Sequence, residues 1–282
     1  MERLLVIDGN WYLHRCFFTL KTSRPIEDVL PMNFVGLVCK DAAAVKATHL
    51  LIAFDGPNVF RYKLYPEYKA NRGGGKNDSE EEGGKDIYQY LPHVRKLVEE
   101  LGWVFKQNSK HEADDIGASA AAQYTLPTVI GTADKDSYQL LSARVRLYNS
   151  TTKPPIFIDE KRAVKRKGVA INQMVMFQTL IGDSTDNIPE LMSPGKAKKM
   201  IQQYGSFKKW YAKGTAEDKR WLNVNTVALR LNRKLVELVT DLALPDIEEL
   251  KVPKKTRQGM TRAWYEYQDF LYPKTKGLFN KR

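Results

Sequence analysis

Three short apolar runs, each ending at one or more aspartates, dominate the pattern of hydrophobic and polar positions. They are RLLVIDG (3–9), THLLIAFDGP (48–57) and LPTVIGTADKD (126–136). Short apolar runs that stop at Asp, Gly or Pro are typical of buried strands that reach a loop. Helical patterns accompany them at about 29–47, 86–101 and 113–124. Alternating strands and helices predict an α/β fold with a mainly parallel sheet flanked by helices.

Beyond about residue 160 the pattern becomes helical. Further helices are expected at 171–182, 195–204 and 217–240. We therefore predict two domains, an α/β core at 1–160 and a helical region with a basic, aromatic tail at 161–282. The glycine-rich segment RGGGKNDSEEEGGK (72–85) cannot contribute to a core, and we expect it to be a mobile loop.

Acidic residues gather at the ends of the predicted elements. They are Asp8, Asp55, Glu112, Asp114, Asp115, Asp134, Asp136, Asp183 and Asp186. A single acid at a strand end is usually a turn-former or a helix cap. Parallel sheets, however, bind ligands beyond the carboxyl ends of their strands, so an acid at every such end predicts a shared site.

Three of these acids fall within four positions of the heptapeptide HEADDIG (111–117). On an ideal helix Glu112 and Asp115 share a face, whereas Asp114 points well away from them. The three carboxylates converge only if Glu112 precedes the first helical turn, and the helix N-terminus then eases the repulsion of the acids that follow. We predict that Glu112 lies just before a helix and that the three acids form one wall of a metal site.

Carboxylates without histidine or cysteine companions are ligands for a hard cation. The four histidines are scattered and none is expected to bind a metal, while Cys16 and Cys39 are expected to be buried free thiols. Such an oxygen-only set favours Mg²⁺, with Mn²⁺ as a substitute, over zinc. Clustered carboxylates that hold two Mg²⁺ ions are typical of phosphodiester hydrolysis.

The net charge points to a polyanionic partner. The chain has 45 Lys and Arg against 33 Asp and Glu, a formal charge of +12. If metal ions neutralise the nine acids, 45 basic residues face 24 acids, an excess of 21 that suits nucleic acid. The chain has no apolar run of membrane-spanning length and no signal peptide, so we expect a cytoplasmic protein with no membrane partner.

Five sequence motifs, taken in order, resemble one family. They are VIDGN (6–10), FDGPNVFRYKLYPEYKANR (54–72), EADDI (112–116), TADKDSYQL (132–140) and GDSTDNIP (182–189). Together they resemble the 5′-nucleases, which comprise flap endonucleases, the 5′–3′ exonuclease domain of bacterial DNA polymerase I and stand-alone bacteriophage 5′-exonucleases. The compact length is most similar to a stand-alone, bacteriophage-type member, for which the location would be the host cytoplasm.

The resemblance implies a PIN-like fold with a mobile arch at about 61–92 and a helix–three-turn–helix DNA-binding element at about 183–206. It also implies two metal sites. The first would be surrounded by Glu112, Asp114, Asp115, Asp134 and Asp136. The second would be held by Asp183 and Asp186, with Asp136 shared between the two metal sites. Asp8 and Asp55 would lie between the two ions and contact them largely through bound water. The expected activity is Mg²⁺-dependent cleavage of DNA at 5′ flaps and 5′ ends, in replication or primer removal.

The segment RYKLYPEYKANR (61–72) interleaves basic residues with tyrosines, a pattern that suits single-stranded DNA, although an ordinary basic surface helix shows it too. By resemblance, Tyr68 would stack near the cleavage site, and Lys69 and Arg72 would polarise the scissile phosphate. Arg61 is a weaker candidate for the same phosphate, and Lys63 is a candidate DNA contact.

The sequence departs from the family after Pro189. The segment ELMSPGKAKKMIQQYGS (190–206) keeps a single glycine of the usual glycine-rich turn, Gly195, before Gly205. Lys196, Lys198 and Lys199 are expected to contact DNA phosphates in place of backbone amides, which should steepen the salt dependence of binding. A monovalent-cation site is not expected there, and RAWYEYQDFLYP (262–273) is expected to be a packing helix rather than a DNA-facing strip.

Two other functions are compatible with parts of this pattern. One is a DNA-binding replication accessory protein whose nuclease site is inactive, although every acid of the pattern is present. The other is a small ribonuclease of the related PIN-like fold, although those chains lack the helical segment that follows Asp186. We expect a monomer that acts on 5′-flapped or 5′-ended DNA and on RNA–DNA primer hybrids as a further substrate.

Overall fold

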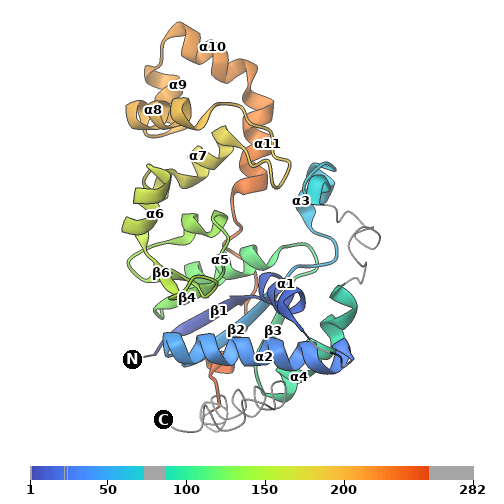
Figure 1. Ribbon diagram of the computed structural model, residues 1–282. Coiled ribbons are helices and arrows are strands. Elements are labelled where there is room, and N and C mark those ends of the chain that lie inside the picture. Colours follow the sequence, from blue (N-terminus) through green and yellow to red (C-terminus); the bar gives the residue numbers. More distant parts are fainter. Residues whose placement is uncertain (1, 22, 24, 73–86, 254–282) are drawn as a thin grey trace.

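The computed structural model describes residues 2–21, 23, 25–72 and 87–253 (Figure 1). The glycine-rich segment after Arg72 and the predicted helix at 262–273 lie outside these residues.

A six-stranded sheet forms the centre of the α/β core. Its strands are β1 (Leu4–Asp8), β2 (His49–Phe54), β3 (Val104–Gln107), β4 (Thr128–Gly131), β5 (Val145–Asn149) and β6 (Ile156–Ile158). They lie in the order β3-β2-β1-β4-β5-β6, and all neighbours pair in parallel except β5 and β6. The three predicted strands are therefore the adjacent central strands β2, β1 and β4, which are buried on both faces.

Helices cover both faces of this sheet (Figure 1). The helices α1 (Gly9–Thr19), α2 (Ile26–Val45) and α4 (Leu91–Glu100) pack with alternate strand residues in one apolar core. The helix α5 (Ala113–Gln123) packs on the opposite face, where a second core continues into the helical region. The sequence pattern did not predict α1, which begins where the Asp8 side chain accepts a hydrogen bond from the Trp11 amide at 3.1 Å.

The helical region lies on the side of the sheet that α5 covers (Figure 1). It contains α6 (Glu160–Lys167), α7 (Met174–Ile181), α8 (Pro194–Tyr204), α9 (Phe207–Lys213), α10 (Ala216–Val224) and α11 (Thr226–Val236). The single helix predicted over 217–240 is wrong, because the chain divides into α10 and α11 at Asn225. The Asn225 side chain donates to the Trp221 carbonyl at 2.8 Å and so satisfies a carbonyl at the end of α10.

Short helices complete the chain, and the segment after α11 returns to the core. The short helices are α3 (Phe60–Leu64), η1 (Ala70–Arg72), η2 (Ile87–Tyr90), η3 (Asp136–Leu140), η4 (Ile171–Gln173) and η5 (Ile247–Leu250). After Val236 the backbone runs along α5, where the Leu242 amide donates to Ser119 at 3.2 Å. Within the described ranges, no helix combines the length and apolar character needed to cross a bilayer.

Candidate active site

The predicted acids meet at the carboxyl edge of the three central strands. Asp8 is the last residue of β1, Asp55 follows β2, and Asp134 lies three residues beyond β4. Hydrogen bonds fix two of them: Asp8 accepts from the Thr132 hydroxyl at 3.0 Å, and Asp55 accepts from the Ala113 amide at 2.7 Å. The second bond ties the strand edge to the first turn of α5, so three strands and one helix deliver carboxylates to one place.

The first acidic group is defined as Asp8, Asp55, Glu112, Asp114 and Asp134. Glu112 is buried and the other four are half-buried, and their carboxylates repel one another. Burial raises the pKa of Asp8 to about 7, and the charges of Asp55 and Asp134 act in the same direction. Burial and the charge of Glu112 raise the pKa of Asp55 to about 6. Burial, followed by the charges of Asp8 and Asp134, raises the pKa of Asp114 well above its usual value. The charge of Lys69 lowers the pKa of Asp55 and Asp114 but does not offset burial and repulsion, so these acids outweigh the positive charge beside them.

The second acidic group consists of Asp136, Asp183 and Asp186. Burial raises the pKa of Asp136 to about 7, and repulsion from Asp134, Asp183 and Asp186 adds to the shift. The short loop after α7 carries Asp183 and Asp186, and backbone bonds between Asp183 and Ile188 close it. Asp134 therefore links the two groups, as expected for a pair of neighbouring cation sites.

Gly182 is required for the loop that presents the second group. Its φ is +62°, and a side-chain carbon there would come within 2.4 Å of the carbonyl oxygens of Ile188 and Pro189. Only glycine satisfies both the backbone conformation and the close approach.

The carboxylates fit a partly hydrated divalent cation better than a metal ion that protein ligands enclose. Among the residues that the structure describes, no three His, Cys, Asp or Glu side chains are close enough to enclose an ion by themselves. Mg²⁺ usually keeps several waters and takes only one or two carboxylates directly. Two groups of half-buried and buried carboxylates that repel one another suit such partly hydrated cations, because the ions would supply positive charge to balance them.

Lys69 joins the two acidic groups. Its Nζ donates to Glu112 Oε1 at 2.5 Å, and its backbone amide donates to the Asp186 carbonyl at 2.9 Å. Burial alone would lower the pKa of Lys69, but Glu112 and the other nearby acids hold it well above its usual value. Lys69 also has a φ of +57°, an unusual conformation for a residue with a side chain. The fold thus keeps a charged ammonium group between the two acidic groups.

Glu112 lies where the sequence predicted. It has an extended backbone and immediately precedes α5, so its carboxylate turns back towards the site.

Asp115, on the other hand, is not placed as a metal ligand. Its two oxygens accept four hydrogen bonds, from Arg61 Nη1 (2.6 Å) and Nη2 (2.8 Å) and from the amides of Glu112 (3.2 Å) and Val239 (2.9 Å). Four donors fill the acceptor capacity of a carboxylate, so the prediction of Asp115 as a ligand is corrected.

The structure also corrects the prediction for Arg61. Its side chain is fully buried, and its remaining contacts are with Glu112 and with the carbonyls of Leu235 and Glu237. A guanidinium group that is buried among five acceptors cannot meet a phosphate that arrives from solvent. Arg61 instead neutralises Asp115 and connects α3 to the end of α11.

The Tyr68 ring is packed rather than exposed. It lies in a small apolar cluster with Ile188, Leu235 and Val236 and is only 4% exposed, while its hydroxyl donates to Glu112 at 3.2 Å. The structure therefore differs from the prediction that this ring is available for stacking on a base.

The lysines predicted to contact DNA lie on α3 and α8. Lys63 of α3 and Lys196 and Lys199 of α8 are exposed. Lys198 is half-buried, with its Nζ 5.8 Å from the centre of the Phe177 ring. The structure does not describe the side chain of Arg72.

Two residues that interact with the second acidic group were missed by sequence reasoning. Gln178 of α7 is buried and donates from Nε2 to Asp136 Oδ1 at 2.5 Å. Lys167, at the end of α6, has a pKa lowered by burial, although the charge of Asp136 opposes this shift. A lone glutamine in an apolar helix and a lysine in a basic run carry no sequence signal, because only the fold brings them to Asp136.

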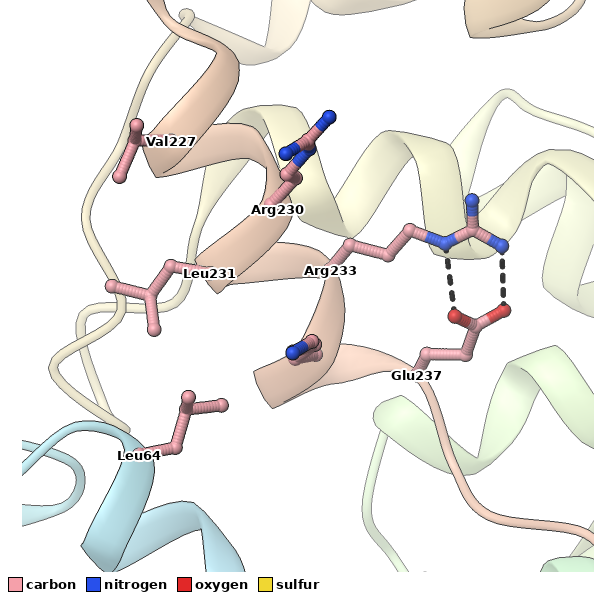
Figure 2. A pocket seen from close by; sticks show the side chains of 7 residues that line it. Leu64, Val227, Arg230, Leu231, Arg233 and Glu237 are labelled. Carbon is pink, nitrogen blue, oxygen red and sulfur yellow. Dashed lines mark hydrogen bonds and ion pairs between the residues drawn. The ribbon is translucent and has the colours of Figure 1, made fainter.

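The structure has two hollows of interest, and only one adjoins the acids. The larger, about 510 Å³, lies between α3 and α11 and is lined by Leu64, Leu231 and the Arg233–Glu237 ion pair among others (Figure 2). No member of either acidic group lines it. The smaller, about 320 Å³, has Asp55 in its wall together with Tyr62 and Tyr88.

Comparisons with known proteins identify the family. Residues 3–170 match the family described as "5′-3′ exonuclease, N-terminal resolvase-like domain", and residues 169–258 match "5′-3′ exonuclease, C-terminal SAM fold". The DNA polymerase I of Chloroflexus aurantiacus is 26% identical over 94% of this chain, which spans only 29% of that protein. The 5′-3′ exonuclease of Aquifex aeolicus is 26% identical over 90% of this chain and 88% of its own length.

Solved structures share the fold. The bacteriophage T5 D15 flap endonuclease, crystallised with DNA and metal ions, has a TM-score of 0.67 at 19% identity, covering 95% of this chain and 100% of that one. The match confirms the predicted mainly parallel sheet with a helical C-terminal region. Because the two family descriptions together cover residues 3–258, the chain belongs to the 5′-3′ exonuclease family.

Proposed function

We propose that this protein is a metal-dependent 5′-nuclease that hydrolyses phosphodiester bonds of DNA at 5′ flaps and 5′ ends. The observation that carries the proposal is the pair of acidic groups, half-buried for the most part, at the carboxyl edge of the sheet, joined by Lys69. The related T5 enzyme, named a flap endonuclease and crystallised with DNA and metal ions, supports the substrate class.

Two Mg²⁺ ions, for which Mn²⁺ would substitute, are the proposed cofactors. The first acidic group would hold one ion, with Asp8 and Asp55 acting largely through water, and Asp136, Asp183 and Asp186 would hold the other. When bound, the ions would lower the pKa of the attacking water and stabilise the leaving oxygen. Asp115 is left out of this set because Arg61 and two backbone amides already occupy it.

Lys69 is the proposed cation for the scissile phosphate. Its ammonium group lies between the acidic groups that would hold the ions and donates to Glu112, and it would donate to a phosphate oxygen in place of Glu112. A fixed cation at this point stabilises the negative charge that develops during hydrolysis. Arg72 would assist from the adjoining turn. Tyr68 would serve mainly to position Glu112 through its hydroxyl, and stacking on a base would require the ring to leave its cluster.

In this proposal the helical region binds duplex DNA. Lys196, Lys198 and Lys199 of α8 and Lys63 of α3 would contact phosphates. RNA–DNA primer hybrids are a further proposed substrate, and the protein would act as a monomer. The division into a catalytic core at 1–160, with an arch at about 61–92, and a DNA-binding region at 161–282 remains part of this proposal.

A flap-cleavage assay tests the proposal directly. A duplex with a fluorescently labelled 5′ flap is incubated with the protein in Mg²⁺, in Mn²⁺ and in EDTA, and the products are resolved by length. We expect metal-dependent cleavage near the flap junction, with a ladder of shorter products from 5′ ends. Tight binding of the flap without any metal-dependent product would contradict the proposal and favour an inactive replication accessory protein.

A further inference from the structure

Three hydrogen bonds join two segments that lie far apart in the sequence. We call them the lysine turn, residues 67–71, which carries Lys69, and the aspartate loop, residues 183–188, which carries two members of the second acidic group. In every bond the acceptor is a backbone carbonyl oxygen: the Lys69 amide donates to Asp186 (2.9 Å), Asn71 Nδ2 to Ser184 (2.5 Å) and Asn187 Nδ2 to Glu67 (2.9 Å). Because both segments supply donors, neither can shift past the other without losing these bonds.

Lys69 and Asn187 both have an unusual backbone conformation. Each has a φ of +57°, in the left-handed region that residues with a side chain seldom adopt. Such a conformation persists where the surrounding structure holds it, and it is common at functional sites. Here each residue takes part in a bond between the two segments, so the contact that links the segments also supports their backbone conformation.

This contact restrains Lys69 from its backbone end. Lys69 Nζ donates to Glu112 of the first acidic group, and the Lys69 amide donates to the carbonyl of Asp186 in the second. A lysine side chain is long and flexible, so the position of its ammonium group depends on where its backbone is held. Asn71 and Asn187 hold that backbone through uncharged amide groups that already bond to carbonyls, so neither needs to touch DNA or a cation to affect Lys69.

We propose that Asn71 and Asn187 are positioning residues that hold the ammonium group of Lys69 in a fixed place relative to the second acidic group. This inference rests on the proposed nuclease function and adds two residues that act through Lys69. The coupling between the lysine turn and the aspartate loop is reciprocal, as any linkage between two sites must be. Binding of Mn²⁺ at the second acidic group should therefore also order the lysine turn.

Asn187→Gly tests the role of the side chain, because glycine suits the left-handed backbone and removes only the bond to Glu67. We expect single-turnover cleavage at saturating flap DNA to slow about tenfold, the upper part of the range for the net loss of one hydrogen bond. The Kd for the flap in EDTA should stay near the wild-type value. In a Lys69→Ala background the same change should cause almost no further loss, because the residue that Asn187 positions is gone.

Further asparagine variants sharpen the test. Asn71→Leu should slow cleavage as Asn187→Gly does, whereas Asn71→Gln, which keeps an amide donor, should retain more of the wild-type rate. Asn58→Gly, at an exposed asparagine in the turn before α3, is the matched control and should cleave at the wild-type rate. The melting temperature of each variant identifies any loss that is due to unfolding.

Hydrogen–deuterium exchange measures the coupling without DNA or cleavage. The Lys69 amide is bonded to the aspartate loop, so Mn²⁺ alone should slow exchange of the lysine turn in the wild-type protein. In Asn187→Gly, we expect Mn²⁺ to slow this exchange much less. Exchange of α4, which lies outside both segments, should not respond to Mn²⁺ in either protein.

The outcomes separate this inference from the function on which it rests. If Asn187→Gly and Lys69→Ala slow cleavage independently, so that their factors multiply, Asn187 does not act through Lys69 and the inference is wrong. Equal losses in Asn71→Leu and Asn71→Gln, or exchange of the lysine turn that ignores Mn²⁺ in the wild type, would also overturn it. Failure of the wild-type protein to cleave the flap would contradict the nuclease function itself, while the exchange measurement would still test the coupling.

Discussion

Arg61 and Asp115 form a buried bidentate ion pair, with distances of 2.6 Å from Nη1 to Oδ2 and 2.8 Å from Nη2 to Oδ1. The pair connects α3 to the first turn of α5, which follows Glu112 and bears Asp114. Arg61 also donates to the carbonyls of Leu235 and Glu237, so the same side chain holds the end of α11. A single buried cation thus links α3, α5 and the end of α11.

Arg61→Met should destabilise the protein because it leaves Asp115 buried without a cation. Breaking one partner of a buried ion pair costs about 3–5 kcal/mol, and the loss is measured by urea unfolding. Arg61→Lys should not restore stability fully, because an ammonium group cannot reproduce the two parallel bonds. A matched control is Arg95→Met, which removes the exposed pair with Glu99 on α4 and should cost less than about 1 kcal/mol.

The same variant distinguishes a supporting role for Arg61 from a direct one. If Arg61→Met is as stable as the wild type but cleaves flaps a hundredfold more slowly, Arg61 contacts the substrate. Its ion pair with Asp115 would then not be its whole role.

Lys69→Ala should slow the chemical step by about 10²–10³-fold, the usual effect of removing one donor to a developing oxyanion. The measurement is the single-turnover rate at saturating DNA, where weaker binding has no influence. Lys63→Ala, which removes an exposed lysine six residues earlier, should weaken DNA binding but leave that rate near the wild-type value. A near-normal rate for Lys69→Ala would exclude Lys69 as the cation for the scissile phosphate.

Asp136→Asn and Asp183→Asn should abolish cleavage and leave DNA binding intact or stronger. Each change removes a negative charge from the second acidic group, which eases the approach of DNA while weakening the second metal site. Fluorescence anisotropy of a labelled flap in EDTA measures binding without cleavage. Loss of binding in both variants would point to a structural role for these two aspartates.

The central sheet and most of the acids were predictable because strand ends leave a local signature. Asp8, Asp55 and Asp134 each follow an apolar run, and parallel neighbours must bring such residues to one edge. The half-exposed strand β3 and the helix α1 have no comparable pattern. Helical periodicity continues through Asn225 without a Gly or Pro, so the sequence shows one helix where the structure has two.

The roles of individual charges were less predictable. Asp114 and Asp115 are adjacent in sequence and have the same side chain. Asp114 nevertheless faces the other acids, whereas Asp115 faces Arg61, 54 residues away. Arg61 and Lys69 lie in one basic segment, and only the fold buries the first and leaves the second between two acidic groups. Such distinctions depend on long-range packing, which a single sequence does not display.

Gln178→Leu should weaken the binding of Mn²⁺ at the second site. Gln178 holds Asp136 through one oxygen, and loss of an outer hydrogen bond to a ligand typically lowers metal affinity about 10–100-fold. Titration of the protein with Mn²⁺ alone, followed by electron paramagnetic resonance, measures the affinity without DNA or cleavage. Gln203→Leu on α8, where the side chain bonds only to Tyr204 among the contacts described, is the control and should bind Mn²⁺ normally. Equal affinity for the two variants would show that Gln178 does not orient Asp136.

Lys196→Ala and Lys199→Ala should each reduce the salt dependence of DNA binding. If each lysine contacts one phosphate, each substitution lowers the slope of log Kd against log salt by about 1, uniformly for all sequences. The measurement is anisotropy of a labelled flapped duplex across a series of KCl concentrations in EDTA. Lys96→Ala, on the opposite side of the core in α4, should leave the slope unchanged. An unchanged slope in the two α8 variants would mean that α8 does not contact the DNA backbone. The DNA-binding surface would then have to lie on α9 or α11.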